Sequence, residues 1–332
     1  MLPRKILFIL LALLLLLLFV ADIALGSVNI AAADVWRILK EGPSNEATSF
    51  IIWELRLPKA IAAILVGSGL SISGLLLQSL FRNPLAGPSV LGISSGASLG
   101  VAFYVMAGGG LIGVLSAGST ALFAIAGALI VLLAVMAVSV KVNDTVSLLI
   151  VGIMFGSITG ALISVLQYFS TADMIQYFII WTFGSLGSIG WEELKLVSIL
   201  VLLGAAFTLY LIKPLNAMLL TDNYAESMGI SIKRTRNSII IISSLITGVI
   251  TAFAGPIVFV GVAVPHLSRN LFRTVDHRVL VPASVLLGAN LMLLCDIISQ
   301  LPGTATALPI NSVTALFGAP VVIWIIIQNR KR

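Results

Sequence analysis

Long apolar runs separated by short polar links make up most of the chain. The first run extends from Ile6 to Ala21, continues past Asp22 to Leu25, and follows Arg4 and Lys5. Nine more runs occupy residues 60–81, 90–107, 119–140, 147–169, 194–212, 235–254, 257–272, 280–298 and 312–328. Since a transmembrane helix needs about 20 apolar residues, the pattern predicts an all-α polytopic membrane protein with about ten transmembrane helices.

Several segments depart from this pattern. The first run has the positive flank of a cleaved signal peptide, but its length favours a retained helix. The stretch from Asp22 to Lys59 is the longest non-apolar segment. The pieces 174–186 and 303–310 are too short to cross the membrane. They predict re-entrant or surface helices, which membranes tolerate where protein or a water-filled cavity surrounds them.

Composition narrows the class of protein further. Of the 332 residues, 59% are apolar and only 10% are charged, whereas soluble domains are about a quarter charged. These values exclude a soluble globule, a disordered chain and a nucleic-acid binder. A single cysteine, Cys295, excludes an internal disulfide and a multi-thiolate metal site. We therefore expect one transmembrane domain over 1–332, with no catalytic residue, no metal site and no cofactor.

The placement of charge supports an orientation in the bilayer. The chain begins with Arg4-Lys5 and ends with Arg330-Lys331-Arg332, so both termini are predicted to be cytoplasmic, which requires an even number of spans. On a ten-span topology, 14 of the 19 basic residues lie inside. The five outside are Arg37, Lys40, Arg56, Lys59 and Lys195. The net charge of +6 thus reflects orientation and requires no acidic substrate.

Two runs carry glycine at every fourth position, which places the glycines in one row on a helix face. The rows are Gly92, Gly96 and Gly100 in the third run, and Gly152, Gly156 and Gly160 in the fifth. Such rows allow close helix packing. Alternatively, these two helices line a pathway and slide against each other.

The sequence also limits what could supply the energy if this membrane protein transports a solute. Ion-coupled carriers usually place acidic or histidine residues near the membrane midplane, whereas here Asp296 and His266 fall near the ends of their spans. This argues against a carrier driven by protons or sodium ions. No lysine follows a glycine, so the chain has no P-loop. If ATP drives transport, another polypeptide must bind it.

Several motifs together resemble one family, the FecCD/BtuC-type permeases of ABC importers for metal chelates. The family's R-L-P-R start of the second span matches Arg56-Leu-Pro-Lys59, and its Q-x-x-x-x-N-P-L-A-x-P turn matches the segment from Gln78 to Pro88. Its G-x-I-x-F-I-G-L-x-x-P-H pattern matches Gly255 to His266. Further matches are Leu91-Gly92 through Gly96-Ala97, Asp276-His277-Arg278, Leu308 to Thr314 and Gly318 to Trp324.

This resemblance covers essentially the whole chain and implies a set of partners. It implies a ten-span permease in the bacterial inner membrane that works as a dimer, and we expect a homodimer rather than a heterodimer. Two ABC ATPase subunits would bind below it, and a periplasmic substrate-binding protein would deliver cargo from above.

The resemblance also implies a docking site and a gate. Arg56 and Lys59 match the basic residues that meet glutamates of the binding protein; the alternative is that both anchor the helix at the membrane surface. Gln300 stands where the family often has another arginine.

Thr145 and Val146 match the cytoplasmic gate, in the turn Asn143-Asp144-Thr145-Val146-Ser147. A plain turn with Asp144 or Thr145 as helix N-cap is the alternative.

The longest inside loop, about 213–233, predicts the element that receives the ATPase stroke. We expect the preceding span to end near Lys213-Pro214. A short helix should follow, with Asp222 as N-cap and Gly229 closing it. The resemblance assigns this coupling role to Leu215, Leu220, Asp222, Ala225, Glu226 and Gly229. A surface turn that merely links two spans is the alternative.

The cargo is the least constrained feature. Iron(III)–siderophore is the first expectation because that is the family's commonest role, and vitamin B12 and haem follow. Two different classes of function remain open: an ion-coupled secondary carrier and a membrane scaffold without transport.

Overall fold

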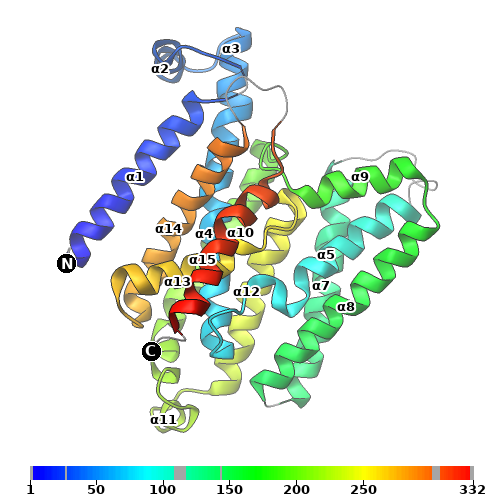
Figure 1. The fold of residues 1–332 in the computed structure, drawn as a ribbon, viewed down its shortest axis with the longest axis vertical. Coiled ribbons are helices and arrows are strands. Elements are labelled where there is room, and N and C mark those ends of the chain that lie inside the picture. The colour runs from blue at the N-terminus through cyan, green and yellow to red at the C-terminus, as the bar shows by residue number, and fades with distance from the viewer. Residues whose placement is uncertain (1–2, 27, 108–116, 143, 301–306, 330–332) are drawn as a thin grey trace.

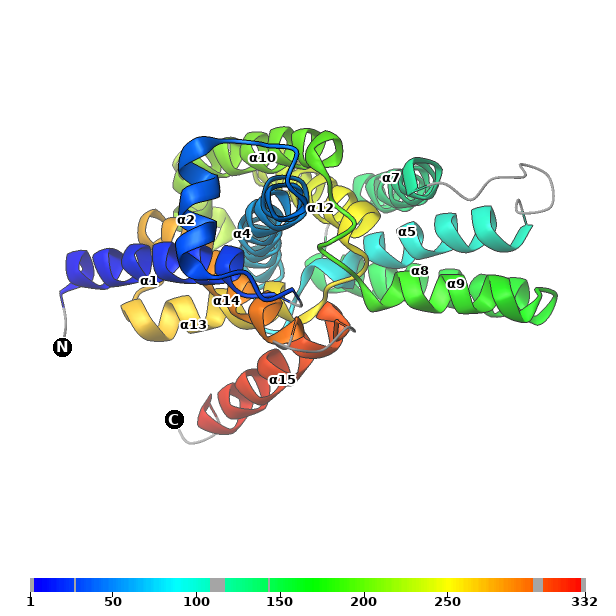
Figure 2. The same ribbon diagram turned by 90° about the horizontal axis from the view of Figure 1, so that it is seen from above.

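The computed structural model describes residues 3–26, 28–107, 117–142, 144–300 and 307–329. Every regular element in these ranges is a helix, as Figure 1 shows. The helices run mostly along the long axis of the molecule, and α1, α14, α4, α10 and α12 lie side by side (Figures 1 and 2). The predicted all-α class is confirmed.

Each of the ten predicted spans corresponds to a helix. These are α1 (Arg4–Ala24), α4 (Leu57–Phe81), α5 (Ile93–Ala102) with the π-helical turn Phe103–Ala107, α7 (Ala117–Lys141), α8 (Thr145–Tyr168), α10 (Trp191–Met218), α12 (Ile232–Ala254), α13 (Phe259–Phe272), α14 (His277–Ser299) and α15 (Ile310–Asn329). Within the described ranges, seven helices are long and apolar enough to cross a membrane. Since α5 and α15 form shorter apolar stretches and α13 has 14 residues, ten spans is an approximate count.

Helix α4 is the centre of the molecule. It packs against α14, α12, α13 and α10, and the view from above shows it enclosed by these helices (Figure 2). Its sequence explains this position, because small and apolar residues surround the whole helix and leave no polar face for water. In contrast, only 17% of the residues in the most apolar 18-residue stretch are buried in α1, and the same share is buried in α8.

Two glycines allow neighbouring helices to approach α4 closely. A Cβ atom at Gly67 would overlap the carbonyl oxygen of Gly288 in α14, and one at Gly74 would overlap the carbonyl oxygen of Gly261 in α13. Each contact is therefore backbone against backbone, the usual use of small residues between membrane helices. The central helix is held at a fixed distance from both neighbours.

The segments between the spans carry additional helices. The polar stretch after α1 contains α2 (Ala32–Glu41) and α3 (Ala47–Phe50), and a π-helical turn (Ile51–Arg56) joins α3 to α4 without a break. The second span thus begins earlier than predicted. The expected short piece 174–186 is confirmed as α9 (Ala172–Phe183), whereas residues 303–306 of the other expected piece lie outside the described residues.

The helix ends gather at two opposite ends of the molecule. We call the end with α2 and α3 the upper end and the end with α11 (Asp222–Ser227) the lower end, as Figure 1 draws them. Contacts between distant segments define the lower end: Arg82 bonds to Asp222, and Arg236 to the carbonyl oxygens of Ser139 and Val142. Residues predicted to share one side of the membrane therefore lie together.

Candidate functional site

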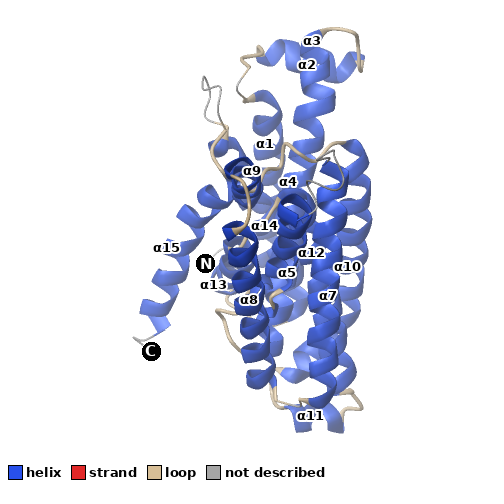
Figure 3. Cartoon of the chain, turned by 90° about the vertical axis from the view of Figure 1, so that its right-hand side faces the viewer, coloured by secondary structure: helices blue, strands red, loops and turns tan. Residues whose placement is uncertain are grey.

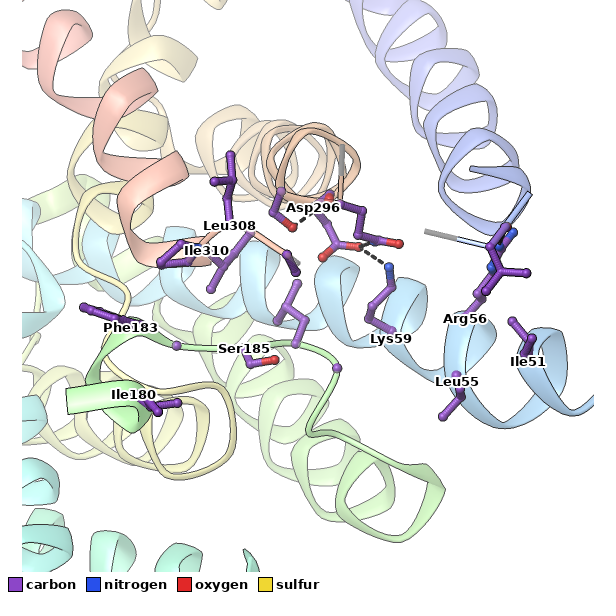
Figure 4. Close-up of a pocket in the computed structure, with 18 residues that line it drawn as sticks. Ile51, Leu55, Arg56, Lys59, Ile180, Phe183, Ser185, Asp296, Leu308 and Ile310 are labelled. Carbon is purple, nitrogen blue, oxygen red and sulfur yellow. Dashed lines mark hydrogen bonds and ion pairs between the residues drawn. The ribbon is translucent and has the colours of Figure 1, made fainter. Parts of the chain in front are cut away.

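A cavity of about 460 Å³ opens at the upper end. Its wall comes from the start of α4, the loop between α9 and α10, the end of α14 and the residues just before α15. Figure 4 shows apolar side chains, among them Leu55, Ile180 and Phe183, around a charged pair formed by Lys59 and Asp296. Together with Val28, the cavity thus brings together segments from the N-terminal, middle and C-terminal parts of the chain.

Lys59 occupies the charged side of this cavity. Its Nζ lies 2.7 Å from Asp296 Oδ2 and 3.9 Å from Asp22 Oδ1. All three side chains are buried: 10% of the Lys59 side chain is exposed, 5% of Asp296 and none of Asp22. Gln300 Nε2 donates a second hydrogen bond to Asp296 Oδ2 at 2.8 Å. One ammonium group is thus shared by two carboxyl groups, from α1 and α14.

Asp22 is the least satisfied member of this cluster. Neither of its carboxylate oxygens accepts a hydrogen bond from a described donor, although buried polar groups are usually paired. Asp296 and Asp22 are both ion-pair partners of the Lys59 ammonium group, so the two carboxyl groups compete for one cation. In the described part of the chain no group of three acidic, cysteine or histidine side chains could hold a metal ion.

Arg56 has a different set of partners. Its Nη1 donates to the carbonyl oxygens of Ile23 and Ala24, each at 2.9 Å, and its Nη2 donates to the carbonyl oxygen of Val28. The last carbonyl groups of a helix have no partner within the helix. The guanidinium of Arg56 is the hydrogen-bond donor for these carbonyl oxygens. Gly26 leaves room for it, since a Cβ at Gly26 would lie 2.8 Å from Arg56 Nη2. Arg56 therefore fastens the end of α1 to α4.

The sequence placed Arg56 and Lys59 at the outer start of the second span, and the structure places both at the upper end. Their docking role remains a prediction. Both residues are buried, with 4% and 8% of their surface exposed, and both have partners within the chain. Those partners were not predicted from the sequence. The one signal for them was Asp22, a carboxyl group inside an otherwise apolar run, which needs a partner when buried.

The predicted gate residues lie at the start of α8. Thr145 is the first residue of this helix, and Val146 is 60% exposed. Asp144 is the N-cap, as the plain-turn alternative proposed, because its Oδ2 accepts hydrogen bonds from Ser147 N at 2.7 Å and Ser147 Oγ at 2.8 Å. These bonds, led by the backbone amide, lower the pKa of Asp144. Asn143 lies outside the described residues, and the gating role stays a prediction.

At the lower end, α11 forms the predicted short helix between α10 and α12 (Figure 3). Ala225 is fully buried and packs with Ala217 and Met218 of α10 and with Ile230 and Ile232. Leu215 is buried, whereas Leu220 and Glu226 are exposed. Gly229 has a φ of 79° just after the helix, the left-handed conformation that glycine adopts readily. The short helix is thus seated firmly on α10, while its coupling role stays a prediction.

Two details of the predicted loop are wrong. The N-cap of α11 is Thr221, whose Oγ1 accepts from Tyr224 N at 3.1 Å. Asp222 instead accepts a hydrogen bond from Arg82 Nη2 at 2.7 Å, because the end of α4 brings a guanidinium to it. Pro214 does not stop α10, which continues to Met218. A proline removes one helix hydrogen bond, but a membrane helix tolerates this loss where its neighbours compensate.

The two predicted glycine rows have different neighbours. Gly96 and Gly100 face α7, where a Cβ would meet the backbone at Gly127 and Phe123. Gly92 and Gly152 bring the start of α5 against α8. Gly156 is in ordinary contact with Ser95, and the space around Gly160 is open. The two rows do not face each other along their length, and a pathway between them stays a prediction.

Comparison with known proteins agrees with the motifs. A profile of the FecCD transport family matches residues 13–328. The vitamin B12 import system permease protein BtuC of Klebsiella pneumoniae subsp. pneumoniae is 36% identical over 305 residues, which cover 92% of this chain and 90% of that protein. BtuC of Escherichia coli O9:H4 is 38% identical over 282 residues, or 84% of each chain.

The fold has a close counterpart among solved structures. A metal-chelate type ABC transporter in an inward-facing conformation aligns with a TM-score of 0.83 and 28% identity, covering 98% of this chain and 99% of that one. The alignment therefore includes the helices on both sides of α4 and both ends of the molecule. On the family profile, the curated relatives and this fold together, the chain belongs to the FecCD transport family.

Proposed function

We propose that this chain is the permease subunit of an ATP-driven importer in the bacterial inner membrane, and that its cargo is vitamin B12 or a closely related corrinoid. The observation that carries the cargo assignment is the 36% identity to a vitamin B12 permease over 92% of this chain. Iron(III)–siderophore, the first expectation from the sequence, becomes the alternative, with haem beside it.

The arrangement of the two ends supports the division of labour between partners. The upper end would face the periplasm and receive the substrate-binding protein near Arg56 and Lys59. The lower end, which gathers Arg82 and Arg236, would face the cytoplasm in accordance with the positive-inside rule. Both termini would then be cytoplasmic, and two copies of this chain would form a homodimer.

The lower end would also receive the ATPase. Helix α11 projects across it (Figure 3), and its buried Ala225 seats it on α10. Force applied to α11 by an ATPase subunit would therefore reach the end of α10. The ion pair between Arg82 and Asp222 adds a second connection, to the end of the central α4. At the same end, Thr145 and Val146 would close the pathway between the two copies of the permease.

Transport in liposomes tests this proposal. The permease, reconstituted with its ATPase and its substrate-binding protein, should accumulate cobalamin in the presence of ATP, and vanadate should block the uptake. Ferric siderophores and haem serve as competing cargoes under identical conditions. Uptake of a ferric siderophore without uptake of cobalamin would overturn the cargo assignment and leave the permease assignment intact.

One observation keeps an ion-coupled carrier as the second candidate: Asp22 and Asp296, although near the ends of α1 and α14, are buried carboxyl groups of membrane-spanning helices. Such groups often mark proton pathways. A proton ionophore separates the two candidates. ATP-driven import should continue in its presence, whereas uptake that stops with the ionophore and needs no ATP would establish the carrier.

A further inference from the structure

We propose that Lys59 is the docking cation of this permease and that Asp296, supported by Asp22, holds it inside the cavity until the binding protein arrives. An acidic side chain of the binding protein enters the cavity and replaces Asp296 as the partner of the Lys59 ammonium. This inference rests on the proposed docking at the upper end, and it assigns Asp22 and Asp296 as residues that control the docking lysine.

The hydrogen bonds distinguish Lys59 from Arg56. Arg56 donates to three backbone carbonyl oxygens at and just after the end of α1, through one buried and two part-buried hydrogen bonds. Its departure would remove all three bonds at once, which is costly. The ion pairs of Lys59 within the described ranges join it to carboxyl groups. A carboxylate of another protein can form the same kind of ion pair and so take the place of such a partner. A lysine also carries its charge on a flexible four-carbon stem. Lys59, and not Arg56, is therefore the residue that exchanges its ion-pair partner.

The cavity provides access for the incoming group. Lys59 and Asp296 both line it, and together with Arg56 they are the charged residues of its described wall. Its volume of about 460 Å³ exceeds the roughly 30 Å³ of one water molecule many times over, so a side chain has room to enter. The apolar wall formed by Leu55, Ile180 and Phe183 (Figure 4) strengthens any ion pair formed inside, because its effective dielectric constant is below that of water.

The exchange leaves the carboxyl groups in a defined state. The ion pair between Lys59 and Asp296 breaks, and a new one forms between Lys59 and the incoming carboxylate. Gln300 Nε2 still donates to Asp296. Asp296 therefore keeps one donor, at the end of its own helix α14, after the ammonium group has left.

Two substitutions of the competing carboxyl groups follow from this scheme. Removing the competing carboxylate with Asp296→Asn should tighten docking roughly five- to tenfold, the scale of one charge pair close to a protein surface. Asp22→Asn should have the same sign and a smaller effect, since Asp22 lies 3.9 Å from Lys59.

The test uses the permease–ATPase complex in nanodiscs and the binding protein that co-purifies with it, stripped of cargo. Calorimetric titrations at low salt give the docking affinity of the wild type and of each variant. The matched control is Glu192→Gln, which removes the exposed ion pair between Lys195 and Glu192 at 2.7 Å and should leave docking unchanged. Asp296→Glu keeps the competing charge and should behave as the wild type.

A double-mutant cycle shows whether Asp296 acts through Lys59. Lys59→Gln should weaken docking, and adding Asp296→Asn to it should restore nothing, because the released cation is then missing. Weaker or unchanged docking by a folded Asp296→Asn variant would overturn the inference. If that variant does not fold, Asp22→Asn decides: docking no tighter than in the wild type overturns the inference as well.

The same measurements separate this inference from the proposed docking site. Full affinity of Lys59→Gln would refute Lys59 as a docking residue and the inference with it. Weak docking by Lys59→Gln, combined with wild-type affinity in Asp296→Asn, would refute the exchange alone.

Discussion

Replacing Ala225 with proline tests whether α11 acts as a rigid element between the ATPase and the membrane helices. Ala225 is the fourth residue of α11, its amide donates to Thr221 O at 3.1 Å, and its own carbonyl oxygen accepts from Met228 and Ile230. A proline removes the donor, and its ring clashes with the carbonyl of Thr221. A proline in a helix interior costs about 3 kcal/mol or more.

The size of α11 makes this cost decisive. The helix has six residues, and helices this short depend on tertiary packing because their own hydrogen bonds do not sustain them. Its packing is centred on Ala225, which is fully buried against Ala217 and Met218. A penalty of about 3 kcal/mol shifts a local equilibrium by about a hundredfold, so the helix should unfold locally while the membrane-spanning helices remain in place.

The assay measures three quantities on the same preparation. Ala225→Pro should insert into the membrane and bind the substrate-binding protein as the wild type does, but it should lose ATPase binding or ATP-dependent uptake. Ala225→Gly is the matched control, since it keeps the amide and costs only about 1 kcal/mol, and it should retain most of the uptake. A cysteine replacing Ser227, which is exposed on the same helix, should cross-link to one in the ATPase. Full uptake by the proline variant, with no cross-link at any position from 222 to 228, would refute the coupling role.

Three further predictions concern stability. Arg56→Gln should release the end of α1 and lower the melting temperature, with a loss of about 3 kcal/mol for its charged hydrogen bonds; an unchanged melting temperature and unchanged hydrogen exchange of residues 21–24 would contradict this. Gly74→Ala should force α4 away from Gly261 and destabilise the protein by about 1–3 kcal/mol, whereas Gly118→Ala, in open space, should not. The hydrogen bond from the Ser147 amide lowers the pKa of Asp144. The contribution of Asp144 to stability is therefore complete above the unfolded pKa of about 3.9 and is lost as the pH falls through the lower folded pKa. The difference in melting temperature between the wild type and Asp144→Asn should vanish at that low pH, and a difference that persists in strong acid would exclude this origin.

The sequence was sufficient for the span pattern because burial in a bilayer leaves a strong local signal. An uninterrupted run of about 20 apolar residues is typical of a membrane-spanning helix, and each predicted run became a helix. Boundaries were less predictable, since they depend on contacts outside the run. Pro214 lies inside α10 although proline commonly follows a helix end. Similarly, the cap of α11 moved to Thr221 because Arg82, 140 residues away in the sequence, binds Asp222.

The charged residues of the upper end were identified by type and position, but their partners were not. Spacing along one helix shows which side chains share a face, whereas the partners of Lys59 come from α1 and α14, whose relative placement depends on packing around α4. That placement assigns different tasks to two basic residues that a motif treats alike. Arg56, with five donors in a planar fork, suits several fixed carbonyl oxygens at the end of α1. Lys59, a point charge on a flexible stem, suits carboxylates that it can exchange. A basic residue at either position satisfies the motif, but only an arginine at 56 fastens α1 through two nitrogens at once, so Arg56→Lys should disturb this end of the molecule more than Lys59→Arg.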